Sequence, residues 1–415
     1  MTLPKSTEEA IRKDWRVFTA LTFLFSFGFA VYTGVFQNFL RDVLHANALD
    51  LGKLESLREI PGLLTALTAG TLVAFAETRI AAMGLIIGAI GIGASGLCHG
   101  FPALIAITVF WSVGFHLWTT MQTSITLVLA RGREGGRHLG RMSGVGAIAT
   151  IVGLGVVYLL TRQLPGEYPI YFAVAGVAIL FGGGLGFSLS THAAGGKRER
   201  LIFRREYSLF YLLTFLEGCR RQIFSIFAQF TLILVYNVPV DKMVLIQFVN
   251  SIMIFATAPA IGRYIDRKGE RGPLCFYAIG LIMVFLGYAH FRNVNALVAL
   301  FLLDNVLFSF GVGFNTYLHR IVRPGELTPC LAMGVTMNHI AAVTVPYFGA
   351  LLWLKTQNYQ TPFWVGVAIA AVSLCATRWL PRGHSDAGDR SIREPDVSDG
   401  ISNVVEHPHA GGEIV

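Results

Sequence analysis

The sequence predicts an all-α membrane protein in which twelve transmembrane helices form two pseudo-symmetric six-helix bundles. Three observations support this fold class. Hydrophobic residues make up 53% of the 415 residues and charged residues only 14%, against about 25% charged in an ordinary soluble domain. Apolar runs of about 20 residues, the length that crosses a hydrocarbon core as a helix, recur along the chain. The second half also repeats features of the first in the same order.

The apolar runs give the expected spans in order. They cover residues 16–40, 53–76, 80–98, 101–130, 142–162, 168–190, 207–236, 242–264, 273–291, 295–321, 329–354 and 360–380. The loops between them are short, so we expect no inserted soluble domain. A membrane-embedded enzyme would need clustered nucleophiles, metal ligands or a donor-binding loop, and we therefore expect no enzyme.

The spans divide the chain into five parts. We expect a cytoplasmic stub over residues 1–15, a first bundle over 16–190, a linker over 191–206, a second bundle over 207–380 and a disordered tail over 381–415. The first run is too long for a signal peptide and follows a mixed-charge stub, so it is expected to be a retained span. The tail is too polar to bury.

Basic residues predict the orientation. Lys and Arg gather in the loops that twelve spans place on the same side as both termini, namely Arg131, Arg133, Arg137, Arg141, Lys197, Arg198, Arg200, Arg204, Arg205, Arg263, Arg267, Lys268, Arg271, Arg320 and Arg323. The positive-inside rule then puts both termini in the cytoplasm. The net charge of +8 therefore predicts a position in a bilayer, in a bacterial inner membrane, and not a nucleic-acid partner. We expect a monomer.

Neither the cysteines nor the tail histidines predict a metal or a cofactor. The five cysteines are scattered among the spans without a CxxC pair, so we expect small packing residues and no disulfide framework or zinc site. His407 and His409 could chelate a metal weakly, but two histidines in a loose tail are usually solvated. The glycine-rich runs lack the strand and the Lys-Ser/Thr of a phosphate loop, so we expect no ATP site.

An internal repeat is visible when the second half is slid onto the first. At a nearly constant offset Gln37 meets Gln229, Gly70 meets Gly262, Gln122 meets Asn315 and Thr123 meets Thr316. Matches in chain order are what two parallel repeats about an axis along the membrane normal require. This favours a two-bundle transporter over a channel.

The segment 262–271, "GRYIDRKGER", follows the eighth expected span. It resembles the signature of the major facilitator superfamily at this turn, and the twelve-span layout resembles that family too; no subfamily is indicated. The resemblance implies secondary transport by alternating access. It also implies a gate in which a small residue allows close helix approach and an Asp caps a helix and pairs with Arg, here Gly262, Asp266, Arg267 and Arg271. The equivalent first-half turn has Ala74 in place of the Asp, with Glu77 and Arg79 as candidate substitutes.

Polar and aromatic stripes within the spans predict a solute site. In the seventh span Glu217, Arg220, Arg221 and Phe224 share a helix face, and such a stripe is expected to face a cavity. The tenth span offers Asp304, Phe308, Gly311 and Asn315, and the fourth offers Trp111, Phe115, Trp118 and Gln122. The family resemblance implies that spans one, four, seven and ten line a central cavity. The expected solute ligands are Trp111, Phe115, Trp118, Gln122, Glu217, Arg220, Arg221, Phe224, Asp304 and Asn315.

Four titratable residues at mid-depth are candidates for proton coupling: Asp304, Glu217, His116 and His339. Asp304 has no basic residue one turn away in its own span, whereas Arg221 is placed to pair with Glu217. Structural networks are the alternative for both acids, and Arg220 and Arg221 could instead bind an anionic group of the solute. Glu55, Arg58 and Glu59 lie toward the outer end of the second span, where we expect an outer gate or an interfacial ion pair.

These expectations combine into one function. We expect a secondary active transporter, coupled to protons, of a small organic solute with an apolar body and a charged group. Two alternatives stay open at this stage: a facilitative uniporter, and a transporter-like sensor or assembly partner with little transport. Import and export are not distinguished.

Overall fold

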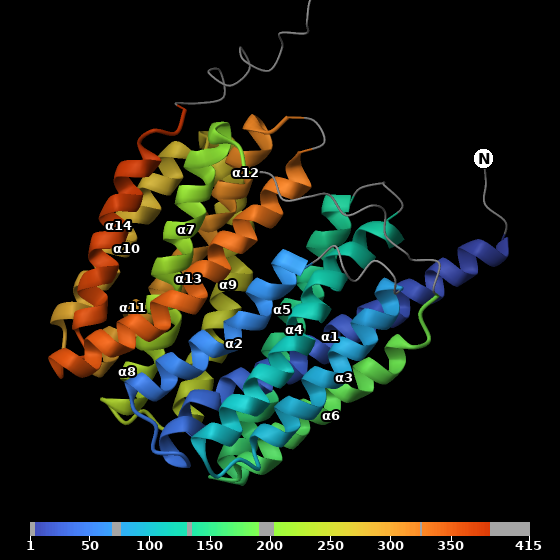
Figure 1. Ribbon diagram of the computed structural model, residues 1–415, viewed down its shortest axis with the longest axis horizontal. Helices are drawn as coiled ribbons and strands as arrows, with labels where there is room; N and C mark the ends of the chain where they lie inside the picture. Colours follow the sequence, from blue (N-terminus) through green and yellow to red (C-terminus); the bar gives the residue numbers. More distant parts are fainter. Residues whose placement is uncertain (1–4, 69–75, 131–134, 191–202, 324–325, 382–415) are drawn as a thin grey trace, which may run out of the picture.

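The computed structural model describes residues 5–68, 76–130, 135–190, 203–323 and 326–381 (Figure 1). The regular structure of these residues is helical throughout, and no strand occurs among them. Nine candidate spans within these ranges are long and apolar enough to cross a membrane. The shorter apolar helix α14, the charged helix α2 and the interrupted seventh span complete the expected layout. The all-α, twelve-span prediction is confirmed.

Six helices form the first half. They are α1 (Lys5–Asp42), α2 (Ala48–Thr68), α3 (Glu77–Ser95), α4 (Phe101–Leu129), α5 (Gly135–Gln163) and α6 (Tyr168–Gly186). Helix α1 begins eleven residues before the expected span. The stub contains residues that favour a helix, and the Glu8–Arg12 pair at 4.0 Å supports its first turns. Helix α2 begins early because the Asn47 side chain accepts the amide hydrogens of Leu49 and Asp50.

The second half has six spans, two of them interrupted. The seventh span consists of α7 (Ser208–Gln222), the π-helical turn η3 (Ile223–Ala228) and α8 (Gln229–Leu234), preceded by the short turn η2 (Arg205–Tyr207). The tenth consists of α11 (Val294–Phe308), η4 (Ser309–Gly311) and α12 (Val312–Ile321). The uninterrupted spans are α9 (Val240–Lys268), α10 (Arg271–His290), α13 (Leu327–Thr356) and α14 (Thr361–Thr377). A π turn inside a span often marks a functional site.

Small residues let helices approach closely within the first half. Helix α3 packs along α4 and α6, while α1 packs along α5 and α6. At the α3–α4 crossing, a Cβ on Gly114 would overlap the carbonyl oxygen of Gly84. Glycine is therefore required there for close packing, as in membrane helices generally. In the second half α7 packs against α13 and α14, and α10 against α14.

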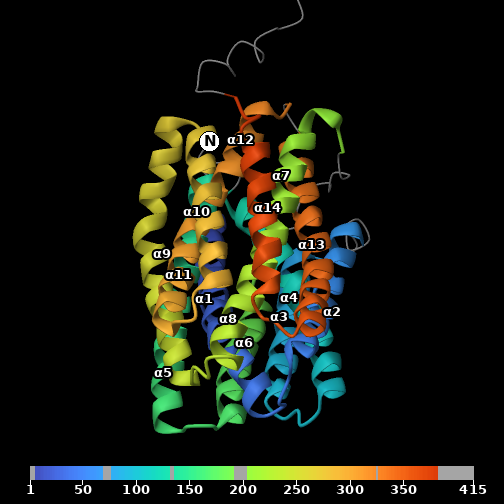
Figure 2. The same cartoon turned by 90° about the vertical axis from the view of Figure 1, so that its left-hand side faces the viewer.

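The two halves meet chiefly along α2–α13 and α5–α9, and at α1–α8. Asn38 donates to the carbonyl of Val238 at 3.1 Å, and the amide of Tyr347 donates to Ser56 at 3.1 Å. A Cβ on Gly52 would lie 2.5 Å from the carbonyl oxygen of Pro346. Helix α1 begins and α14 ends at one face of the molecule (Figure 2). We name that end the terminal face, and the opposite end, near the α1–α2 connection, the closed face.

Candidate solute-binding cavity

A cavity of about 540 Å³ lies between the two halves. Helices α1, α2 and α4 line it from the first half, and the seventh span and α13 line it from the second. Its volume falls within the range of about 300–1,000 Å³ that is usual for small-molecule sites. Its lining combines an aromatic wall with several charged groups.

The aromatic wall comes from α1 and α4. Phe29, Tyr32 and Phe36 of α1 lie beside Trp111 and Phe115 of α4. The ring centroids of Phe29 and Phe115 are 5.0 Å apart, and those of Tyr32 and Trp111 are 5.2 Å apart. Two expected cavity residues, Trp111 and Phe115, therefore lie where the sequence predicts them. The family resemblance implied that the first span lines the cavity, but the sequence analysis named none of its residues, although Phe29 and Phe36 are two turns apart on one face.

Trp118 and Gln122 do not line this cavity. The Trp118 ring packs against Phe25 at 5.5 Å and Phe18 at 6.1 Å between their centroids, and Trp118 is fully buried. Gln122 donates to the hydroxyl of Thr22 at 3.4 Å. Both lie one to two turns nearer the terminal face, where α1 and α4 pack together. The expectation that the whole α4 stripe faces the cavity is therefore wrong for these two residues.

Helix α2 brings three charged residues to the cavity. Nη2 of Arg58 lies 2.8 Å from Oε2 of Glu55 and 2.9 Å from Oε1 of Glu59. All three side chains line the cavity instead of lying at its outer rim, where the sequence predicts an outer gate. The Ser112 hydroxyl donates to the Arg58 carbonyl, which ties α4 to α2 one turn before Pro61.

Two histidines meet at the α2–α4–α13 junction. Nδ1 of His339 lies 3.2 Å from the second oxygen of Glu59, and the rings of His116 and His339 are 5.0 Å apart in an edge-to-face arrangement. A Cβ on Gly62 would overlap the Cε1 atoms of both rings, so glycine makes the room in which they meet. This cluster joins the first half to the second.

The same cluster has the residue types of a metal site. Ligand atoms of Glu59, His116 and His339 lie within 4.8 Å of one another. However, Arg58 already occupies the first oxygen of Glu59, and Arg221 adds a second guanidinium to the cavity. Two neighbouring positive charges oppose a divalent cation. We therefore interpret the cluster as a hydrogen-bonded contact between the halves.

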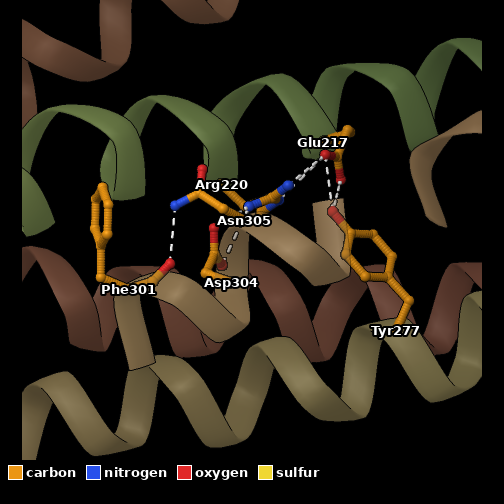
Figure 3. Close-up of polar contacts among 6 residues, drawn as sticks. All are labelled: Glu217, Arg220, Tyr277, Phe301, Asp304 and Asn305. Carbon is orange, nitrogen blue, oxygen red and sulfur yellow. Dashed lines mark hydrogen bonds and ion pairs between the residues drawn. The ribbon is translucent and has the colours of Figure 1, made fainter. Parts of the chain in front are cut away.

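A separate charged network lies inside the second half (Figure 3). Arg220 is 1% exposed; its Nη2 lies 2.7 Å from Oε1 of Glu217 and its Nη1 3.1 Å from Oδ2 of Asp304. The Tyr277 hydroxyl lies 2.8 Å from each oxygen of Glu217. Phe224 packs nearby against Phe301. The network joins α7, α10 and α11 and therefore stabilises the packing of this half.

Glu217, Arg220, Phe224 and Asp304 thus do not line the cavity, contrary to the expectation for their stripe. Asp304 also has a basic partner, although none lies in its own span. Arg220 and Arg221 face different sides of α7 because consecutive helical residues point about 100° apart. Of the two arginines, one faces the bundle core and the other the cavity.

Arg221 is the arginine that faces the cavity. It is exposed there, and its guanidinium carbon lies 5.2 Å from the centroid of the Phe308 ring. Within the described part of the chain it makes no ion pair and no hydrogen bond. The expected Arg221–Glu217 pair does not form because Arg220 and Tyr277 engage both oxygens of Glu217.

The sequence and the fold were compared with known proteins. The family model described as Major Facilitator Superfamily matches residues 18–328. The chain belongs to the major facilitator superfamily. No curated protein sequence gives a significant match, and the family match identifies no subfamily.

Solved major facilitator structures share this fold at low identity. The nucleoside transporter NupG has a TM-score of 0.70 and 14% identity, over 87% of this chain and 97% of that chain. A bacterial homologue of the iron transporter ferroportin, in an inward-facing state, has a TM-score of 0.71 and 14% identity, over 89% and 99%. The inward open xylose transporter XylE from E. coli has a TM-score of 0.68 and 14% identity, over 90% and 97%. At such identities the likeness establishes the fold alone.

The family signature, at the end of α9 and the start of α10, makes different contacts from those expected. Asp266 and Arg267 are exposed, and neither forms an ion pair with a described residue. Instead Glu270 pairs with Arg320 at 2.9 Å, and Arg271 donates to the carbonyl of Leu380 at 3.4 Å. A Cβ on Gly262 would meet no described atom within 4 Å.

The remaining expected residues of this family member lie outside the cavity lining. Asn315 on α12 is exposed and is not part of that lining. Ala74 and Gly70 of the first-half turn lie outside the described residues. Of the proposed substitutes, Glu77 accepts from the Ser124 hydroxyl at 2.7 Å and Arg79 donates to the Phe187 carbonyl at 2.7 Å. Both contacts lie within the first half, so the gate role of this turn stays a prediction.

Proposed function

We propose that this integral membrane protein is a secondary active transporter that binds a small organic solute in the central cavity and works by alternating access. The observation that carries the proposal is the cavity itself. Both halves line it, and contacts between the halves close it toward one face. In the proposal the units 16–190 and 207–380 rock against each other so that the other face opens in turn.

The orientation of the transporter follows from its charge. The terminal face carries basic clusters such as Arg263, Arg267 and Lys268 at the end of α9. By the positive-inside rule we propose that this face is cytoplasmic, in a bacterial inner membrane. The described conformation is then closed toward the outside.

We propose that protons drive transport through the junction of Glu59, His116 and His339. Histidine can act as a proton shuttle, and here the rings of His116 and His339 meet across the two halves while His339 faces Glu59. The groups that face the pair are Glu59 and Arg58 of α2 and Arg221 of α7. In the proposal, a proton carried on His339 strengthens its contact with Glu59 across α2 and α13. Protonation is thereby linked to the conformation of the halves.

Asp304 and Glu217 are the other proton candidates, and their buried network supports a structural role instead. Each is held by Arg220 away from the cavity. We therefore expect Asp304→Asn to retain gradient-driven accumulation once its lower stability is allowed for. If Asp304→Asn instead abolishes coupling while solute binding persists, the proton site belongs at Asp304.

The experiment is flux in proteoliposomes under an imposed pH gradient. The chain should accumulate a solute from a panel of small organic compounds, and His339→Gln should retain exchange but lose accumulation. The matched control is His290→Gln, because His290 lies at the end of α10 and is not part of the cavity. Loss of accumulation in both variants would contradict the assignment.

The same flux assay separates the alternatives. A facilitative uniporter would equilibrate the solute with no response to the gradient. A sensor or assembly partner would bind without flux, although folded. The cavity lined by both halves favours a transporter, active or facilitative, over a sensor or assembly partner.

A further inference from the structure

The central cavity holds one positive charge that the described part of the protein leaves without a counter-ion. This charge is on Arg221, which is exposed to the cavity. Polar side chains inside a bilayer are expensive and are normally paired. An arginine without a partner, in a cavity lined by both halves, is therefore placed to receive one from a ligand.

The acids near Arg221 are already engaged. Within the second half, Glu217 and Asp304 both bind Arg220, and Tyr277 also donates to Glu217. These carboxylates lie in the bundle core and do not line the cavity. Both carboxylates are paired with Arg220, and neither forms an ion pair with Arg221.

The acids across the cavity are engaged as well. Glu55 and Glu59 both bind Arg58, and the second oxygen of Glu59 faces His339. With neutral histidines, the two carboxylates and the two guanidiniums that line the cavity balance in number. The pairing is nonetheless unequal, because both acids share Arg58 and Arg221 has none. Among the charges that line the cavity, both acids therefore lie with Arg58 on α2, and Arg221 lies apart from them on the seventh span.

Arg221 is also held in place. Its guanidinium lies over the Phe308 ring at 5.2 Å, and that of Arg220 lies at 5.2 Å from the same ring. A stacked guanidinium is pre-organised and presents a planar set of donors that matches a carboxylate in two parallel hydrogen bonds. The like charge of Arg220 on the same ring favours a pose of Arg221 directed away from it.

We propose that the solute is an organic monocarboxylate with an aromatic or apolar body, whose carboxylate binds Arg221. This inference rests on the proposed transport function and names its substrate class. The body packs against Phe29, Trp111 and Phe115 of the first half while the carboxylate binds the second half. One free guanidinium matches one negative charge, which favours a monocarboxylate over a dianion. Because the solute contacts both halves, its binding responds to their movement.

Binding of matched probes to the purified full chain tests this inference. The probes are 3-phenylpropionate, its neutral amide and the cationic 3-phenylpropylamine, measured by calorimetry in detergent. We expect the acid to bind at least tenfold more tightly than the amide, since a hydrogen bond to a charged group corresponds to roughly tenfold to a hundredfold in affinity. Arg221→Met should remove this preference, and Arg221→Lys should keep part of it. The control Arg263→Met, exposed at the end of α9, should keep all of it.

Three outcomes would overturn the inference in distinguishable ways. If the amide or the amine binds as tightly as the acid and is accumulated in proteoliposomes, the anion site is wrong while the transport function stands. If Arg221→Met keeps the preference for the acid with an unchanged melting temperature, the carboxylate binds elsewhere. If a broad panel of acids, amides and amines neither binds nor moves although the protein is folded, the inference and the proposed function fail together.

Discussion

Replacing each of two adjacent arginines by methionine should give opposite results, although the chemical change is the same. Arg220 is buried and bound by two carboxylates, whereas Arg221 is exposed to the cavity and bound by none of the described residues. Arg220→Met should therefore destabilise the fold and Arg221→Met should not. The pair is a matched test of how the structure divides the charged stripe of α7.

The magnitude follows from the contacts. Removing one partner of a buried ion pair costs about 3–5 kcal/mol, because the remaining charge is left uncompensated. Arg220→Met leaves both Glu217 and Asp304 in that condition, so its effect should lie at the upper part of this range. Arg221→Met loses only a cation–π contact with Phe308, about 0.5–1 kcal/mol at an exposed site. It also removes the cost of an unpaired charge, and the net change should stay within about 1 kcal/mol.

A double-mutant cycle sharpens the measurement. Asp304→Asn alone leaves the 2.7 Å pair between Arg220 and Glu217, so it should cost about 1–3 kcal/mol. Added to Arg220→Met, the same change removes one of two uncompensated acids and should recover part of the loss. The two effects are then strongly non-additive, as expected for residues in one network.

The assay is thermal unfolding followed by tryptophan fluorescence, in one detergent and at one scan rate, because the transition of a large membrane protein depends on the rate of heating. Arg220→Met should lower the apparent melting temperature by roughly 5–10 °C, and Arg221→Met should leave it near that of the parent chain. Equal destabilisation by both variants would refute the division, since Arg221 would then also be a packing residue. An unchanged Arg220→Met chain would refute the buried network.

Three further predictions concern the histidine junction, the interface between the halves and the terminal face. Gly62→Ala should displace the two histidine rings and reduce proton-driven accumulation while sparing folding. Gly184→Ala, whose Cβ meets no described atom within 4 Å, should do neither. Gly52→Leu should open the α2–α13 contact at the closed face. A cysteine introduced at Ser225 in the cavity lining should then be labelled faster from that face, and an unchanged labelling rate would contradict the interface. Hydrogen bonds from Tyr207 and then Arg204 lower the pKa of Glu326. A lowered carboxyl pKa contributes stability above the ordinary value of about 4.3, so the loss of melting temperature in Glu326→Gln should be present at pH 7 and fade as the pH falls below about 4.

The spans could be predicted from the sequence because the length of an apolar run is a local property. Ten of the twelve spans are single helices close to the expected positions. The interruptions at η3 and η4 could not be predicted, because a π or 3-10 turn depends on how the helix packs against its neighbours. The early start of α1 was missed for a different reason: the spans were read from apolar runs, and the stub that extends this helix is polar.

The site was predictable only in part. The pattern of α7 contained the right residue types, but one face of a helix is too broad to decide that Arg220 points inward and Arg221 into the cavity. The partner of Asp304 lies on another helix, and Glu59 and His339 are separated by 280 residues. Such contacts depend on tertiary packing, which a single sequence does not reveal. The aromatic wall of α1 could have been predicted, because the spacing of Phe29 and Phe36 in the sequence puts both on one helix face.

Alternating access requires that the cavity open in turn to each side of the membrane. A decisive experiment replaces the five native cysteines, introduces Ser225→Cys in the cavity lining, and measures labelling by an impermeant thiol reagent in right-side-out and inside-out vesicles. Alternating access should give labelling from both sides, at rates that solute shifts in opposite directions. Labelling from one side only, whether solute is present or absent, would show that the cavity never reaches the other side.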